Sequence, residues 1–167
     1  MILGIDPGTR NIGFAVIRRD GSFVVSGVLD LAEERFDRGM ITVFDWFLEL
    51  VNTHLEAPQW CNTVACEGVY VGGNLRLSAR LGEIVGLMHA VAIITGVEFV
   101  EIAPAAGRKA LTGNGDAADR RALQCAWEHT GNETLTIHEA DALGVALAAL
   151  EIIGKYKEEE HGDKREG

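Results

Sequence analysis

Cysteine is scarce in this chain of 167 residues: Cys61, Cys66 and Cys125 form an odd set without CxxC or zinc-ligand spacing. This pattern is typical of reduced structural thiols in a reducing compartment, so we assign them no chemical role. Basic residues are also few, 15 against 25 acidic ones, which gives a formal net charge of −10 and a pI of about 4.9. Such a charge generally argues against nucleic-acid binding, because the phosphate backbone is itself negative.

Long apolar runs and a secretory signal are also missing. The most apolar run, 84–97, contains His89 and is shorter than the ~20 residues that a membrane-spanning helix needs. Residue 1 leads directly into an apolar stretch, without a basic n-region or a small-residue cleavage site. We therefore expect a cytoplasmic protein without a membrane partner.

The remaining composition is that of a globular domain, with 47% apolar and 24% charged residues. A chain of this length buries about 70% of the surface that its unfolded form exposes, so it needs no disulfide or metal to hold a core. Residues 158–167 are charged and lack apolar side chains. We predict a single domain over 1–157 followed by a charged, disordered tail.

The apolar patterning predicts an α/β fold. Alternating apolar and small residues predict five strands, over 2–8, 12–17, 23–29, 63–67 and 98–102. Asp20-Gly21 predicts a hairpin turn between the second and the third strand. Helices are predicted by the 3.6-residue period over 32–55, 75–95, 118–129 and 138–156, with a Gly- and Ala-rich connection over 104–119. This order indicates a five-stranded mixed sheet with helices on both faces.

Acidic side chains stand where predicted strands end. Asp6 follows the first strand and Glu67 ends the fourth, so the two carboxylates lie side by side if those strands are neighbours. His138 and Asp141, three residues apart at the start of the last helix, share one helical face. The alternatives are a turn-capping role for Asp6, and complementation of the helix dipole by Glu139 or Asp141.

An oxygen-rich cluster of this kind is what hard divalent cations require, since Mg²⁺ is held by a few carboxylates together with water and substrate phosphate. Two such ions could drive phosphodiester hydrolysis, one by activating the attacking water and the other by stabilising the leaving oxygen.

Four segments in order resemble one known family. They are ILGIDPGTRNIGFAVI with Asp6, ACEGVY with Glu67, LRLSARLGEIVG, and HEADALGVALAA with His138 and Asp141. The chain resembles the RuvC-like Holliday junction resolvases of the ribonuclease H-like superfamily, including phage-type members. The first segment alone would be weak, because actin-like ATPases and sugar kinases share it, but four segments with the spacing kept are specific.

This resemblance implies a ribonuclease H-like fold and a structure-selective DNA endonuclease that resolves four-way junctions by paired symmetric nicks. It implies two Mg²⁺ or Mn²⁺ ions held by Asp6, Glu67, His138 and Asp141, and a homodimer. The helix over 75–95 is apolar all round, so we expect it to form the dimer interface. Most members have Asp where this chain has His138; imidazole suits Mn²⁺ better than Mg²⁺, so we expect a preference for Mn²⁺. Glu139 is the second candidate for this ligand.

The residues expected to bind nucleic acid follow from the same resemblance and from charge. Tyr70 stands where the family carries an aromatic that stacks on junction bases. Residues 68–128 balance six acids with six basic residues, whereas 1–67 hold ten acids and five basic residues. The six are Arg76, Arg80, Arg108, Lys109, Arg120 and Arg121. Arg108 resembles a family basic residue, and Arg120 resembles a second one if one residue is inserted; without the insertion, Asp119 occupies that place.

Other functions remain open at this point. A broader branched-DNA nuclease acting on flaps or Y-forks, or an RNA-processing nuclease such as the YqgF-like group, would use the same site. An actin-like nucleotide-binding module would need a second subdomain, for which 167 residues leave no room. A non-catalytic nucleic-acid-binding module would not need all four candidate ligands.

Overall fold

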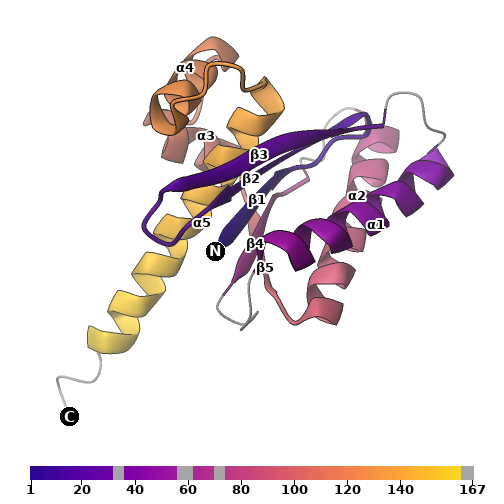
Figure 1. Cartoon of the computed structure of the whole chain (residues 1–167), viewed down its shortest axis with the longest axis horizontal. Helices are drawn as coiled ribbons and strands as arrows, with labels where there is room; N and C mark the ends of the chain where they lie inside the picture. The colour runs from indigo at the N-terminus through magenta and orange to yellow at the C-terminus, as the bar shows by residue number, and fades with distance from the viewer. Residues whose placement is uncertain (32–35, 56–61, 70–73, 163–167) are drawn as a thin grey trace.

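The structure is a computed structural model that describes residues 1–31, 36–55, 62–69 and 74–162 (Figure 1). Its strands are β1 (Ile2–Asp6), β2 (Asn11–Ile17), β3 (Phe23–Asp30), β4 (Thr63–Glu67) and β5 (Glu98–Ile102). Its helices are α1 (Phe36–His54), α2 (Leu75–Thr95), α3 (Pro104–Thr112), α4 (Asp119–Thr130) and α5 (Ile137–Gly162).

The five strands form one mixed sheet in the order β3-β2-β1-β4-β5. β1 pairs with β2, and β2 with β3, in antiparallel fashion, while β4 runs parallel to both β1 and β5. The predicted α/β class, the hairpin at Asp20-Gly21 and the adjacency of the first and fourth strands are confirmed. Because β1 and β4 are parallel neighbours, Asp6 and Glu67 end at the same edge of the sheet.

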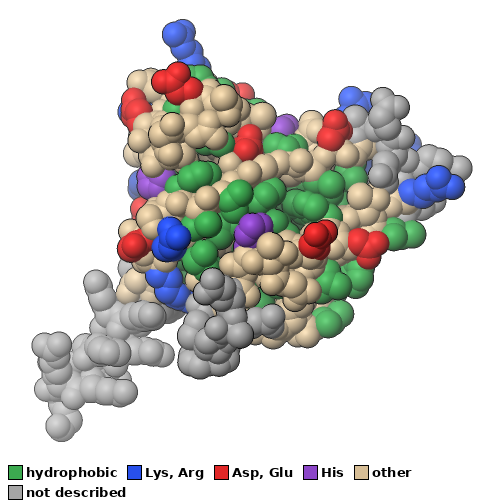
Figure 2. Space-filling model, viewed as in Figure 1, with side chains coloured by type: hydrophobic (Ala, Val, Ile, Leu, Met, Phe, Trp, Pro, Cys, Tyr) green, Lys and Arg blue, Asp and Glu red, His purple; other side chains and the backbone are tan. Residues whose placement is uncertain are grey.

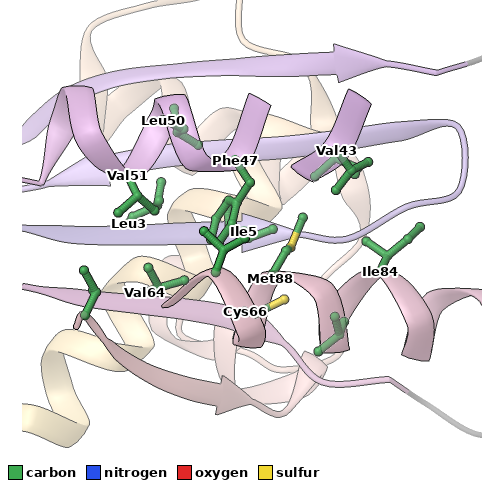
Figure 3. Close-up of a cluster of buried hydrophobic side chains, with 14 of the residues drawn as sticks. Leu3, Ile5, Val43, Phe47, Leu50, Val51, Val64, Cys66, Ile84 and Met88 are labelled. Atoms are coloured by element: carbon green, nitrogen blue, oxygen red, sulfur yellow. The ribbon is translucent and has the colours of Figure 1, made fainter. Parts of the chain in front are cut away.

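Helices cover both faces of this sheet, as predicted. α1 and α2 pack on one face, where the side chains of Leu3, Ile5 and Val64 meet Phe47 and Met88 (Figure 3). α5 packs on the other face, with α3 and α4 behind it (Figure 1). The core on that side consists largely of small residues from α5 and the sheet, including Ala15, Ala65, Ala140, Ala142 and Ala146.

Two glycines let α5 approach the sheet closely. A Cβ atom added at Gly4 in β1 would overlap the backbone oxygen of Ala142 and lie 2.7 Å from the nitrogen of Ala146. A Cβ atom added at Gly13 in β2 would overlap the backbone of His138. Because Gly13 is the register partner of Asp6, this contact fixes the start of α5 beside the end of β1.

We expect Gly4→Ala to lower the free energy of unfolding by about 3 kcal/mol, because α5 backbone atoms cannot yield to the added methyl group. Gly154→Ala in α5 is the matched control: no atom lies within 4 Å of the added Cβ, so better helix propensity should stabilise the protein by up to about 1 kcal/mol. Urea denaturation measures both changes. Equal stability of the two variants would contradict this account of the α5–sheet contact.

Two predicted boundaries were wrong. The Gly- and Ala-rich connection contains the helix α3, which begins with Pro104 in its first turn and ends at Gly113 in the left-handed conformation. The last helix continues to Gly162, past its predicted end near residue 156. Lys and Glu are good helix formers, so a charged segment can continue a helix. The charged, disordered tail over 158–167 stays a prediction; 163–167 lie outside the described residues.

α2 spans the residues predicted for it and buries one side against the sheet. Ile84, Val85 and Met88 are buried, whereas Leu75, Ile93 and Ile94 are each at least 70% exposed. By length and composition alone this 21-residue helix could cross a membrane, and 28% of its most apolar window is buried. The absence of a membrane partner therefore stays a prediction.

Candidate functional site

The candidate site is built where β1 and β4 end. The last register pair of these strands is Ile5 with Cys66, so the following residues, Asp6 and Glu67, leave the sheet next to each other. Asp6 has 17% of its side chain exposed. The two carboxylates repel each other, and this repulsion is one cause of a raised pKa at Glu67.

His138 joins the site from the first turn of α5. Its Nδ1 lies 2.8 Å from Oδ2 of Asp6. Glu139, the second candidate for this ligand position, is turned away: its Oε2 accepts hydrogen bonds from the backbone nitrogen and the hydroxyl of Thr136, and its Oε1 accepts one from Ser26. Thr136 and Glu139 form a capping box, which fixes the first turn of α5 and so the position of His138.

Asp141 reaches the site from the same side of α5 and is paired with Arg108 of α3. Nη2 of Arg108 lies 2.8 Å and 3.0 Å from the two carboxylate oxygens of Asp141. Nη1 donates to Oδ1 of Asp119 at 2.9 Å and to the carbonyl oxygen of Ala117 at 3.1 Å. Asp119 lies beside Arg108, whereas Arg120 is exposed on α4. The insertion that would align Arg120 with the family's second basic residue stays a prediction.

Burial and mutual repulsion make this cluster hard to ionise. Burial, with repulsion from Asp6 and Asp141, raises the pKa of Glu67 to about 7. Burial raises the pKa of Asp141 to about 6, although the Arg108 guanidinium opposes the shift. Burial also raises the pKa of Asp6, against the effects of His138 and Arg108. The site thus holds more carboxyl groups than the Arg108 guanidinium alone can neutralise.

These residues fit a hard divalent cation by donor chemistry. Within the described part of the chain, no three His, Cys, Asp or Glu side chains converge as a ready metal-binding group. Instead, His138 pairs with Asp6, and Arg108 pairs with Asp141. A metal ion would replace the His138 imidazole and the Arg108 guanidinium as the partner of the carboxylates, which are ligands suited to Mg²⁺ and Mn²⁺.

The other predicted nucleic-acid contacts divide into three groups. Arg76 and Arg80 of α2, together with Thr9 from the turn after β1, line a cleft of about 340 Å³. Lys109, Arg120 and Arg121 are exposed on α3 and α4. Tyr70 lies outside the described residues. Thr9 was missed by the sequence reasoning, although it follows Asp6 by only three residues.

Charge is unevenly arranged over the surface. On the face seen in Figure 2, hydrophobic side chains gather between β3 and α1, and Lys and Arg side chains lie at the margins.

Burial raises the pKa of the Cys66 thiol, so this cysteine is kept in its unreactive protonated form. Cys61 lies outside the described residues.

A five-stranded mixed sheet of this order, with helices on both faces, is the ribonuclease H-like fold. The family model described as crossover junction endodeoxyribonuclease RuvC matches residues 2–149. The chain therefore belongs to the RuvC family of crossover junction endodeoxyribonucleases, which are metal-dependent nucleases.

Individual relatives agree with this assignment. The chain is 32% identical over 152 residues to a crossover junction endodeoxyribonuclease RuvC of Anaeromyxobacter sp. (strain Fw109-5), covering 89% of this chain and 71% of the relative. It is 31% identical to the RuvC of Ectopseudomonas mendocina, covering 88% and 84%. The structure of T. thermophilus RuvC in complex with a Holliday junction substrate is similar in fold, with a TM-score of 0.74, 22% identity and coverage of 90% and 93%.

Proposed function

We propose that the chain resolves four-way DNA junctions by paired symmetric nicks, using two Mg²⁺ or Mn²⁺ ions held by Asp6, Glu67, His138 and Asp141. The observation that carries this proposal is the group of carboxylates that end β1 and β4 and begin α5, where repulsion and burial raise the pKa of Glu67 to about 7. Positive charge placed among these carboxylates would favour their ionised forms, and a divalent cation supplies it.

The site residues would divide the work of cleavage between metal binding and neutralisation of the phosphate. Divalent ions would supply activation of water and stabilisation of the leaving oxygen. Asp6 and Glu67 hold the ions from two adjacent strands, and Asp141 and His138 complete the ligand set from α5. Arg108, whose guanidinium already faces Asp141, neutralises the scissile phosphate.

DNA would approach along the surface on either side of this site. The cleft lined by Thr9, Arg76 and Arg80 offers two guanidinium groups for backbone phosphates. Lys109, Arg120 and Arg121 extend the positive charge onto α3 and α4, and Tyr70 would stack on a base at the crossover. Since the net charge is −10, we expect binding to depend on divalent cations and to weaken steeply with salt.

Cleavage of a labelled synthetic four-way junction, beside a Y-fork, a linear duplex and an RNA–DNA hybrid, tests this function in Mg²⁺ and in Mn²⁺. Paired nicks at symmetric positions, in the junction only, are the expected result. Preferred cutting of forks, flaps or RNA would support the alternative of a broader branched-DNA or RNA-processing nuclease with the same metal site. Binding of the junction without cutting of any substrate would contradict an enzymatic role and favour a non-catalytic module.

We predict faster cleavage in Mn²⁺ than in Mg²⁺, by about tenfold at equal concentration, because the imidazole of His138 is a softer ligand than a carboxylate. His138→Asp should reduce this preference, since it restores an all-oxygen ligand set. Initial rates of junction cleavage in each metal measure the ratio. An unchanged ratio in the variant would contradict His138 as a ligand.

We propose that α2 forms a homodimer interface, because two symmetric nicks require two sites related by a two-fold axis. Its outward side carries exposed Ile93 and Ile94 beside Gly82 and Gly86, whose added Cβ atoms would meet no atom within 4 Å. Small residues of this kind permit the close approach of a second helix.

We predict that Ile93→Glu converts the dimer into a monomer, whereas Ile41→Glu, which changes an equally exposed isoleucine on α1, leaves it dimeric. Light scattering at micromolar concentration distinguishes the two masses. A monomeric parent protein would contradict the dimer. If the parent protein binds lipid vesicles and Ile93→Glu does not, α2 faces a membrane instead of a second copy. That result would contradict the expected cytoplasmic location of this single domain.

A further inference from the structure

Arg108 has two hydrogen-bond partners in addition to Asp141. Nη2 faces Asp141, while Nη1 donates both to Asp119 at 2.9 Å and to the Ala117 carbonyl oxygen at 3.1 Å. The Arg108 side chain is only 19% exposed, although Asp119 itself is 72% exposed. The two nitrogens of one guanidinium therefore serve different partners, one inside the carboxylate cluster and one at its rim.

The backbone around Arg108 is tightly fixed. A Cβ atom added at Gly144 of α5 would lie 2.7 Å from the carbonyl oxygen of Gly107, so α3 and α5 touch through their backbones next to Arg108. A Cβ atom added at Gly115 would lie 2.9 Å from the Ala105 oxygen, so the connection that supplies Ala117 lies directly on α3. What remains adjustable is the long Arg108 side chain itself.

Asp119 stands at the first position of α4, where an acidic residue also favours the positive end of the helix dipole. That simpler role would not require its carboxylate to meet a guanidinium from another helix. It would also not explain an acidic side chain at the rim of a site proposed to bind DNA, where its charge repels phosphate.

We propose that Asp119 is a positioning residue, which together with the Ala117 carbonyl anchors Nη1 of Arg108 so that Nη2 is presented to the site. This inference rests on the proposed nuclease function. If a divalent cation becomes the partner of Asp141, Arg108 loses that carboxylate but keeps Asp119 and the Ala117 carbonyl oxygen as partners of Nη1. Its Nη2 is then available for a substrate phosphate. Asp119 thus weakens DNA binding by its charge and favours cleavage by fixing the group that neutralises the phosphate.

Substitution of Asp119 tests this role through two measurements, the rate of cleavage and the affinity for the junction. In Asp119→Asn and Asp119→Ala we expect the single-turnover rate of junction cleavage to fall about tenfold at saturating protein, with junction binding unchanged or tighter. Asp119→Glu should retain most of the rate. Asp116→Asn removes the same charge from the same exposed region and is the matched control; it should keep the parent rate.

A double variant separates positioning from general electrostatics. If Asp119 acts through Arg108, adding Asp119→Asn to Arg108→Gln lowers the rate no further than Arg108→Gln alone. NMR of the arginine side chains in the metal-free protein gives a readout independent of cleavage: rotation of the Arg108 guanidinium should be hindered in the parent and in Asp116→Asn, and faster in Asp119→Asn.

Parent-like cleavage in Asp119→Asn, or guanidinium rotation that Asp119→Asn does not change, would overturn the positioning role while leaving the nuclease function intact. Failure of the parent to cut any junction would instead overturn the proposed function. The NMR result stands in that case, so the two failures are distinguishable.

Discussion

Replacement of Asp6 by asparagine is expected to reduce junction cleavage by at least about a thousandfold, the scale of removing one essential electrostatic group from an active site. Asp6 ends β1, is largely buried, and lies beside both His138 and Glu67. Asparagine keeps the shape of the side chain but removes the negative charge that a divalent cation needs. Single-turnover cleavage of a labelled junction measures the loss.

Junction binding should survive in Asp6→Asn, because the substitution removes a negative charge that repels phosphate, which offsets weaker metal binding, and the basic residues proposed to contact phosphates lie on other elements. Gel-shift titration in parallel with the cleavage assay measures it. Asp45→Asn, which changes an exposed aspartate on α1, is the matched control and should cut at the parent rate. Cleavage by Asp6→Asn within a few fold of the parent would remove Asp6 from the ligand set.

Glu67→Gln is expected to abolish cleavage to a similar extent and yet to stabilise the metal-free protein. Burial and repulsion from Asp6 and Asp141 raise the pKa of Glu67 from 4.5 to about 7. Between these two values the folded protein binds more protons than the unfolded chain, so the free energy of unfolding falls as the pH rises through this window. At pH 8 the full penalty is present, and the neutral amide should relieve about 1 kcal/mol of it after solvent screening.

Thermal unfolding in a chelator at pH 4.5 and pH 8 measures this effect. The gain in Tm of Glu67→Gln over the parent should be seen at pH 8 and should be almost lost at pH 4.5, where Glu67 is protonated in the folded protein and about half protonated in the unfolded chain. A saturating divalent cation should reverse the order at pH 8, because only the parent binds it. A variant less stable than the metal-free parent at pH 8 would contradict the repulsive cluster.

Much of the site could be predicted from the sequence because its carboxylates follow recognisable strands. Asp6 and Glu67 each end a short apolar segment, and parallel pairing of these segments brings the two together. His138 and Asp141 share a face of α5, as their spacing predicted, and the capping box at Thr136 and Glu139 explains which of two adjacent residues faces Asp6.

The parts that could not be predicted depend on contacts between distant segments. α3 was missed because its short Gly- and Ala-rich sequence contains few large apolar residues; its packing depends on Gly107 lying against Gly144. Arg120 was preferred over Asp119 because helical phase was used to infer an insertion, whereas the carboxylate of Asp119 meets Arg108 directly. Neither contact leaves a local pattern in the chain.

A crystal of the protein soaked in Mn²⁺ gives the most direct test of the metal site, through the anomalous signal of the ion. We expect Mn²⁺ peaks bounded by Asp6, Glu67 and Asp141, with His138 turned from Asp6 to one of the peaks as its ligand. Absence of any peak among these carboxylates at saturating Mn²⁺, with His138 still paired to Asp6 and Arg108 to Asp141, would contradict it.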